Sequence, residues 1–356
     1  MRLHQDELDL ARAYSEATPF EGLSREQMHL VMDRGRTLHH WFKQHLVLHS
    51  LINFSLLLFL LSVDYLILLR LPFLFVTRDS LTSVVLAALV TGGLHSFLMY
   101  SIGVWSIHEG AAHRALFPGQ DLASRALEFI ASNLCRLGAM DPRYYAEHHM
   151  SHHAKFGTAE DGEFLNYVRP RRYWLTLLPY GSTLNYSDFI AHRPPQFTVS
   201  FVISLLVAAL YHAIYGYFIY RSFGLRFTLI ALLLFVPHVG FYLDRLRQYS
   251  EHNLMPLDNK DGARSFGLGF WGMLIGGGPW GTPCHWEHHL VPSVPWYQQL
   301  LLHRYLVGIL TRRQREQYLL QPVIGYPRLL WRLWREPKRF EQQISAGPFK
   351  RSTHAS

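Results

Sequence analysis

Residues 81–107 read LTSVVLAALVTGGLHSFLMYSIGVWSI, an apolar run that contains no Asp, Glu, Lys or Arg. About 20 apolar residues in a helix are enough to cross the hydrocarbon core of a bilayer. The run therefore predicts a membrane-spanning helix. His108 and Glu109 follow it directly, so the polar residues begin where the apolar run ends.

Three further apolar stretches, near residues 50–69, 196–220 and 227–243, are long enough or nearly long enough to span. A buried core helix of a soluble protein would explain any one of them, but four in one chain argue against that explanation. A fifth apolar stretch, residues 266–284, holds seven glycines. Because glycine and proline at that density disfavour a long helix, we expect this stretch to dip into the membrane or to pack against the spans. The predicted fold class is all-α, with four transmembrane helices.

Composition and charge exclude several classes of protein. Apolar residues make up 49% and charged residues 17% of the chain, which is too apolar for a disordered protein. Two cysteines, Cys135 and Cys284, are too few for a disulfide scaffold or a zinc-finger array. Residues 303–356 contain eleven Lys and Arg and three Glu, so they carry the whole net charge of +8. Basic residues interleaved with Trp and Leu in this tail indicate an anionic membrane surface as partner rather than nucleic acid.

The distribution of Lys and Arg predicts the orientation. The segment before the first span and the segment between the second and third spans are richer in basic residues than the two short loops, and the tail is strongly basic. Positively charged segments stay on the cytosolic side. We therefore expect a multi-pass protein of the inner (plasma) membrane, with cytosolic N-terminal helices over residues 1–45, a membrane domain over 46–302 and a basic cytosolic tail over 303–356.

Histidine is unusually frequent, with 22 residues, and it gathers in three motifs. Positions i, i+3 and i+4 share one face of a helix, so each of the two later motifs presents three imidazoles together. The two histidines of the first motif are five residues apart, about 140° around an ideal helix. They would bind different ions, or the helix would unwind after Ile107. The motifs are His108-x4-His113, His149-x2-His152-His153 and His285-x2-His288-His289, with His252 as a further candidate.

The four predicted spans return all of these histidines to one cytosolic membrane face. So many neutral imidazoles without cysteine suit iron, copper, zinc or nickel, and they are too many for one ion. The sequence therefore predicts a cytosolic helical cap with a two-metal site. Carboxylates nearby would accept hydrogen bonds from the ligands' other N–H groups. The predicted ligands are His108, His113, His149, His152, His153, His252, His285, His288 and His289, and the predicted acceptors are Glu109, Glu147, Asp161, Glu251 and Glu287.

These motifs resemble the three histidine boxes of the membrane fatty acid desaturases, a superfamily that includes acyl hydroxylases and carotenoid ketolases. The run HWEHHLVPSVPWY at residues 285–297 is similar to the third box and the stretch after it. The resemblance covers about residues 80–300. It implies a non-haem centre of two iron ions, O2 as co-substrate and an external electron donor of the ferredoxin or cytochrome type, and His252 matches an additional ligand position. The third box begins with His285, and no His-Pro-Gly-Gly motif is present, which argues against a fused cytochrome domain.

The predicted function is O2-dependent desaturation of an acyl-chain lipid or an acyl thioester. An acyl hydroxylase, or a carotenoid ketolase or hydroxylase, would use the same scaffold, and the sequence separates these reactions poorly. A membrane haem protein or a metal transporter is a different class. Haem would require paired histidines inside the spans, where His95, His212 and His238 are scattered. A transporter would place its ligands near the bilayer midplane rather than beyond the ends of the spans.

Overall fold

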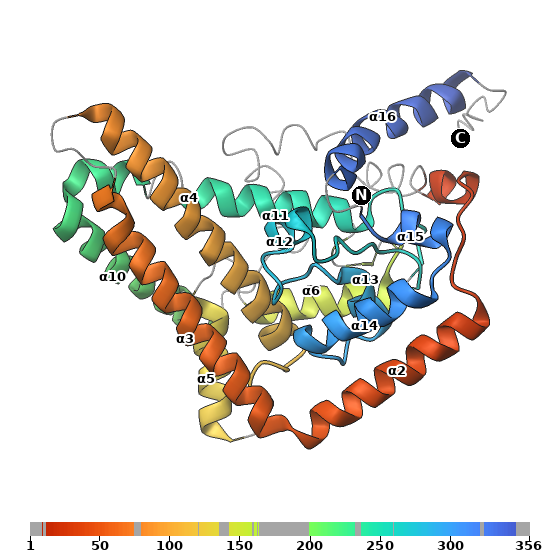
Figure 1. Ribbon diagram of the computed structural model, residues 1–356, viewed down its shortest axis with the longest axis horizontal. Coiled ribbons are helices and arrows are strands. Elements are labelled where there is room, and N and C mark those ends of the chain that lie inside the picture. Colours follow the sequence, from red (N-terminus) through yellow and green to blue (C-terminus); the bar gives the residue numbers. More distant parts are fainter. Residues whose placement is uncertain are drawn as a thin grey trace, which may run out of the picture.

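The computed structural model describes residue 9 and residues 12–74, 80–119, 121–134, 142–158, 160–161, 163, 199–231, 236–258, 260–320 and 324–346. The described residues form helices and connecting loops (Figure 1). The elements are α2 (Arg25–Gln44), α3 (Leu46–Arg70), η1 (Leu71–Leu74), α4 (Leu81–Trp105), η2 (Ser106–Ala112), α5 (Leu122–Leu134), α6 (Pro142–Lys155), α10 (Val199–Leu229), α11 (Val236–His252), α12 (Phe270–Ile275), α13 (His285–Leu290), α14 (Trp296–Ile309), α15 (Arg312–Tyr318) and α16 (Gly325–Ala346).

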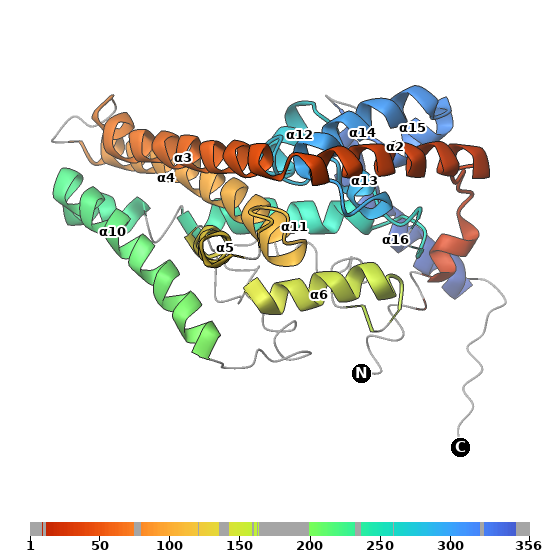
Figure 2. The ribbon, with the colours of Figure 1, turned by 90° about the horizontal axis from the view of Figure 1, so that it is seen from below.

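Helices α3 and α4 form an antiparallel hairpin, and they lie side by side in both views (Figures 1 and 2). The stretches Leu46–Leu74 and Leu81–Gly110 are long and apolar enough to cross a membrane. Only 22% and 39% of their most apolar windows are buried within the protein, so most of this apolar surface faces outward. An outward apolar surface of this kind suits lipid contact. Among the described residues, these two stretches alone meet the criterion, and they match the first two predicted spans.

The other two predicted spans fall in α10 and α11. Helix α10 breaks at Gly224, whose φ of 81° and ψ of 174° are not helical. Glycine adopts a positive φ without the steric cost that a side chain imposes, which explains a turn between the two predicted spans at this position. Helix α11 packs against α4 and ends at His252. The arginines of the middle segment that supported the predicted orientation, at positions 169, 171, 172 and 193, lie outside the described residues.

A buried contact joins one ionisable residue of α3 to one of α4. His95 of α4 lies with its Nδ1 atom 2.6 Å from Oδ1 of Asp64 on α3, and neither side chain is more than 1% exposed. An ionisable side chain is costly to bury in an apolar environment unless it has a partner. Each of the two side chains therefore has its partner on the other helix.

The glycine-rich stretch forms no long helix, as expected from its composition. Its helix α12 has only six residues, and the turn that follows packs closely on α4. Ser101 donates a hydrogen bond to the carbonyl oxygen of Gly277, and the indole Nε1 of Trp280 donates to Oγ of Ser101 over 2.7 Å. Gly277 and Gly278 have φ values of 75° and 86°, and a Cβ atom at Gly278 would lie 3.2 Å from Oγ of Ser101. The glycines thus provide the left-handed backbone with which this turn contacts α4.

Two capping boxes join the beginning of the chain to its end. Ser24 and Gln27 cap α2, and Thr311 and Gln314 cap α15. In each pair the hydroxyl accepts a hydrogen bond from the backbone N–H of the glutamine, and the glutamine side chain accepts one from the backbone N–H of the serine or threonine. The two glutamine side chains also bond to each other, with both N–O distances 2.9 Å. Local helix-start signals therefore also tie two distant segments together.

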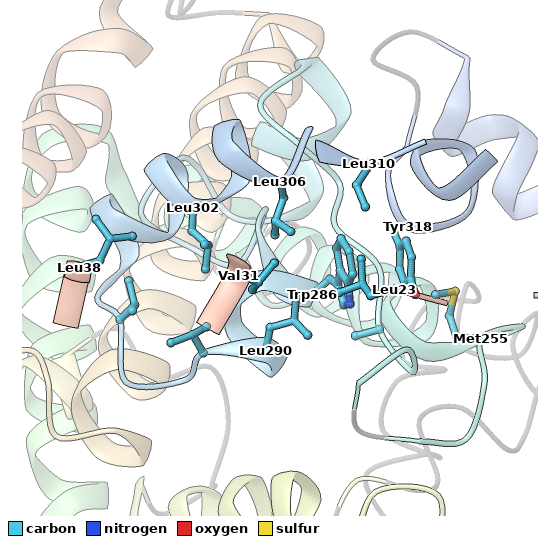
Figure 3. Close-up of a cluster of buried hydrophobic side chains, with 13 residues drawn as sticks. Leu23, Val31, Leu38, Met255, Trp286, Leu290, Leu302, Leu306, Leu310 and Tyr318 are labelled. Carbon is cyan, nitrogen blue, oxygen red and sulfur yellow. The ribbon is translucent and has the colours of Figure 1, made fainter. Parts of the chain in front are cut away.

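A hydrophobic cluster lies between α2, α13 and α14 (Figure 3). The ring of Trp286, on α13, stacks on Tyr318 with a centroid separation of 3.7 Å, and its Nε1 atom donates to the carbonyl oxygen of Lys260. Leu306 of α14 is fully buried in the same cluster. Helix α14 runs unbroken across the domain boundary that the sequence placed between residues 302 and 303, so that boundary falls inside an element of this core.

We expect Leu306→Ala to lower the stability of the protein by about 2–5 kcal/mol, because truncating a buried leucine removes apolar contacts and leaves a cavity. Leu301→Ala on the same helix is the matched control, since Leu301 is 43% exposed. Thermal unfolding followed by tryptophan fluorescence in detergent measures both variants. Equal shifts in melting temperature for the two variants would contradict the assignment of this cluster as core.

Candidate metal centre

Four elements bring histidines to one place at the end of the α3–α4 hairpin. They are η2, which continues α4, together with α6, the last residue of α11, and α13 (Figures 1 and 2). All nine histidines singled out in the sequence lie together there. They form two groups of four in which the candidate ligand atoms all lie within 4.8 Å of one another, plus one residue between the groups. The first group is His108, His113, His149 and His288, and the second is His152, His252, His285 and His289.

The first motif meets on one side because η2 is a π-helix. Hydrogen bonds in a π-helix run from residue i to i+5, so its turn is wider than that of an α-helix, and such turns are frequent at functional sites. The rings of His108 and His113 therefore lie 5.3 Å apart between centroids, although an ideal α-helix would separate them. The backbone N–H of Arg114, with a φ of 51°, donates to Gly110 over 2.8 Å and ends the segment. The sequence left open two ions or a helix that unwinds after Ile107; the structure instead has a π-helix that begins at Ser106, and both histidines belong to the first group.

His153 is the ninth histidine and lies between the groups. Its Nε2 atom is 3.1 Å from Nε2 of His149 and 2.8 Å from Nε2 of His288. Its ring centroid is also 4.6 Å from that of His289 in the second group. The position allows His153 to add a ligand to the first group while touching the second.

Hydrogen bonds at the outer nitrogen of several rings fix which nitrogen points inward. The Nδ1 atom of His149 lies 3.1 Å from Glu163, Nδ1 of His152 lies 3.0 Å from both carboxylate oxygens of Asp161, and Nδ1 of His252 lies 3.0 Å from the carbonyl oxygen of Gly262. Each of these partners is an acceptor, so Nδ1 carries the proton. In a neutral imidazole the other nitrogen, Nε2, is then the acceptor.

The inward Nε2 atoms lie close to one another. Nε2 of His252 is 3.2 Å from Nε2 of His152 and 3.0 Å from Nε2 of His285. In the part of the chain that the structure describes, Nε2 of His108 and Nε2 of His113 are buried and have no hydrogen-bond partner. Buried lone pairs that converge in this way repel one another unless a cation binds between them. The donor set therefore fits two metal ions.

Burial keeps most of these imidazoles neutral. It lowers the pKa of His113 to about 4, and burial together with neighbouring imidazoles holds the pKa values of His149 and His288 well below the usual histidine range. Burial acts most strongly on His152 as well, but the carboxylates of Asp161, Glu163 and Glu251 together outweigh it and raise the pKa of His152. Neutral imidazole is the form that binds a metal, so most of the ligands are ready to bind near neutral pH.

The acids predicted to support the ligands are only partly where the sequence placed them. Asp161 accepts from His152, and Oε1 of Glu251 lies 3.5 Å from Nδ1 of His285. Glu147, by contrast, is exposed on α6. Glu109 accepts from the backbone N–H of Trp296, and Glu287 lies with its Oε1 atom 2.6 Å from Nδ1 of His303, outside the nine.

One supporting acid was missed by the sequence analysis. Glu163 contacts His149, and it comes two residues after Asp161 in the loop that follows α6. Its backbone N–H also donates to Oδ1 of Asp161 over 2.7 Å. The spacing Asp-x-Glu after the second motif could have predicted both acceptors, because a loop directly after a helix can place its carboxylates against that helix.

Two polar residues of α3 hold the backbone on either side of the centre. Asn53 is fully buried, and its Nδ2 atom donates to the carbonyl oxygen of Leu116 over 2.8 Å while its Oδ1 atom accepts from the indole of Trp296. His49, also fully buried, contacts the carbonyl oxygen of Ala115. Neither residue was predicted to have a role. Together they join the loop after the first motif to the start of α14, which follows the third motif.

Comparison with known proteins gives one match. The fatty acid desaturase family model matches residues 80–319, more than half of the chain. No curated protein and no solved structure matches the chain. The matched region includes all nine histidines described above and excludes α2 and α3. The chain therefore belongs to the fatty acid desaturase family.

Proposed function

We propose that this protein is an O2-dependent oxidoreductase that introduces a double bond into an acyl chain at a centre of two iron ions. The observation that carries the proposal is the pair of neighbouring histidine groups whose Nε2 lone pairs converge, placed directly beyond the end of an apolar helix hairpin. Membership of the desaturase family supports the oxidoreductase class and an acyl substrate.

The donor set fits iron. Both groups offer only imidazole nitrogen, which suits iron among the transition metals, and Asp161 and Glu163 act on the ligands rather than in their place. The first group with His153 would hold one ion, and the second group would hold the other. Two iron ions held there would supply the activation of O2 that removal of hydrogen from an unactivated C–H bond requires.

The residues of the chain have three roles in this proposal. Asp161, Glu163 and the carbonyl of Gly262 orient imidazole rings by accepting their Nδ1 protons. The close packing of α13 excludes water, since each of its residues is less than 10% exposed. Fixed ligands in a dry site position one methylene group for reaction instead of exposing the oxidant to solvent.

The membrane arrangement belongs to the same proposal. We place four spans near residues 50–69, 81–107, 196–220 and 227–243, with both termini and the metal centre on the cytosolic side of the inner (plasma) membrane. The two apolar stretches of the hairpin support it. Electrons would come from a separate ferredoxin or cytochrome, and the substrate would be an acyl lipid or acyl thioester. A transporter fits less well, because the histidines lie at helix ends rather than near the midplane.

Product analysis tests the proposal. The purified protein, loaded with iron and supplied with O2 and a chemically or enzymatically reduced electron carrier, is expected to yield a product that has lost two hydrogens. Mass spectrometry of the lipid and a measurement of bound iron, expected at two ions per chain, are made on the same preparation. A product that has gained one oxygen would favour the hydroxylase or ketolase alternative. Full activity with far less than two iron ions per chain would rule out the di-iron centre.

A further inference from the structure

Helix α16 lies outside the part of the chain that matches the desaturase family. The family model ends at residue 319, and the helix begins at Gly325. Its sequence contains five Lys or Arg, two Glu and no histidine, so it supplies none of the candidate metal ligands. The family match therefore says nothing about the role of this helix.

The two faces of α16 differ in character. Tyr326, Leu329 and Leu333 are each less than 5% exposed, so they form the face that is buried against the protein. The residues of the exposed stripe are spaced three or four apart, which places them on one face of the helix. They are Arg328, Trp331, Arg332 and Arg335.

Two arginines of this stripe are not neutralised by an acid. Arg332 is paired with Glu336, with its Nε atom 2.6 Å from Oε1. Among the residues that the structure describes, no carboxylate pairs with Arg328 or Arg335. The guanidinium carbon of Arg335 lies 5.8 Å from the ring centroid of Trp331, whose side chain is 53% exposed. The stripe therefore combines positive charge with a large apolar side chain that water surrounds in part.

Helix α16 begins close to the end of the second apolar stretch. Tyr326 lies in one buried cluster with Tyr100 of α4 and Leu243 of α11. Tyr100 comes ten residues before the end of that stretch at Gly110. From there α16 runs across the direction of α3 and α4 rather than along it (Figure 1). A helix that runs across two membrane-spanning helices lies parallel to the membrane plane.

Helix α12 exposes a further aromatic side chain beside α16. The ring of Trp271 stacks on that of Tyr326, with 5.7 Å between centroids. The ring of Phe270 contacts Trp271, and Phe270 is 68% exposed. Arginines together with exposed aromatic side chains are typical of helices that lie on a bilayer surface, where the rings sit at the level of the headgroups.

We propose that α16 lies on the anionic cytosolic surface of the membrane, with Trp331 among the lipid headgroups and Arg328 and Arg335 bound to phospholipid phosphates. The exposed tryptophan favours a lipid surface over an acidic protein, because an aromatic ring partitions into the headgroup region. The hydroxyl oxygen of Tyr326 lies 2.9 Å from Oγ of Ser250 on α11, two residues before His252. Membrane contact would thus also hold the helix that ends in a candidate ligand.

Quenching of tryptophan fluorescence by brominated lipids tests the contact. The full-length protein is reconstituted into nanodiscs of phosphatidylcholine and phosphatidylglycerol, with bromine near the headgroup end of the acyl chains. Trp331→Phe should remove part of the quenched emission. Trp41→Phe is the matched control and should keep all of it, since Trp41 is 38% exposed on α2, at the opposite edge of the molecule in Figure 1. Equal quenching of the wild type and Trp331→Phe would overturn the proposal.

Hydrogen–deuterium exchange of the α16 backbone tests the role of charge. Exchange should be about tenfold or more slower in nanodiscs that contain phosphatidylglycerol than in phosphatidylcholine alone, because each basic residue near an anionic surface contributes about fivefold to binding. Arg328→Gln/Arg335→Gln should lose this slowing. Arg312→Gln/Arg313→Gln removes the same charge from exposed positions of α15 and should retain it. Exchange that ignores phosphatidylglycerol, or slowing that persists in the first double variant, would contradict the proposal.

Neither measurement depends on turnover, so the inference and the proposed reaction can fail separately. Lipid contact without a desaturated product would contradict the reaction and leave the membrane site of α16 intact. Desaturation without lipid contact would do the reverse. If Arg328→Gln/Arg335→Gln keeps its lipid contact but is reduced more slowly by an acidic carrier protein, the stripe binds a protein and the membrane assignment is wrong.

Discussion

His288→Ala is expected to reduce bound iron from two ions to one per chain and to abolish turnover. His288 belongs to the first histidine group, and its Nε2 atom lies 3.3 Å from Nε2 of His149 and 2.8 Å from that of His153. Removing its imidazole takes away one of the four candidate ligands of the first group, so an ion bound there would lose one of its nitrogen donors. Because O2 activation in the proposed reaction needs both ions, losing one should remove activity altogether rather than lower it in proportion.

Iron analysis, product formation and the amount of protein inserted in the membrane measure this variant. His29→Ala is the matched control, since the His29 side chain is 73% exposed on α2 and is not among the nine. It should keep both iron ions and full turnover. If His288→Ala retained two iron ions and normal activity, His288 would not be a ligand. If the variant failed to insert, the second group could be tested in the same way through His285→Ala.

Asp161→Asn should weaken metal binding at the second group by about 10- to 100-fold, the usual effect of losing a carboxylate that orients a ligand histidine. Both oxygens of Asp161 accept from Nδ1 of His152, and both side chains are fully buried. An amide can present its N–H toward Nδ1 instead, which would favour the tautomer whose lone pair points away from the centre. The charge that raises the pKa of His152 would be lost at the same time.

Competition with a chelator of known affinity measures this change, and the spectrum of the reduced iron centre reports whether the first group is preserved. Glu160→Gln is the control. Glu160 is the neighbouring residue, its side chain is 71% exposed, and it pairs with Lys155. Equal iron affinities for the two variants would show that Asp161 only stabilises the loop.

The helices and the histidine positions could be predicted because both are local signals. The runs at residues 50–69 and 81–107 are apolar by composition, and positions i, i+3 and i+4 share a helix face wherever the helix lies. The convergence of the three motifs followed from the even number of predicted spans between them. None of these inferences required the packing of particular side chains.

The residues that support the ligands could not be predicted in the same way, because their contacts depend on how loops and other helices pack around the histidines. Glu147 precedes the second motif directly, yet the helix turns it outward, whereas Glu163 reaches His149 from the following loop. The π-helical turn that brings His113 to His108 packs against α5 and α6, and the residue pattern did not predict it. Asn53 bonds to Leu116 and Trp296 from α3, a helix that carries none of the nine candidate ligands.

The hydrophobic cluster between α2, α13 and α14 contains residues from distant parts of the chain, which bears on the order in which the protein folds. Trp286 of the third motif is covered by Leu23 from the beginning of the chain and stacks on Tyr318 near its end. Translation supplies Leu23 first and Tyr318 last, so this cover cannot close while the ribosome is still completing α15. The hairpin of α3 and α4 can enter the membrane much earlier. The hairpin of α3 and α4 is therefore complete well before the third motif acquires its cover.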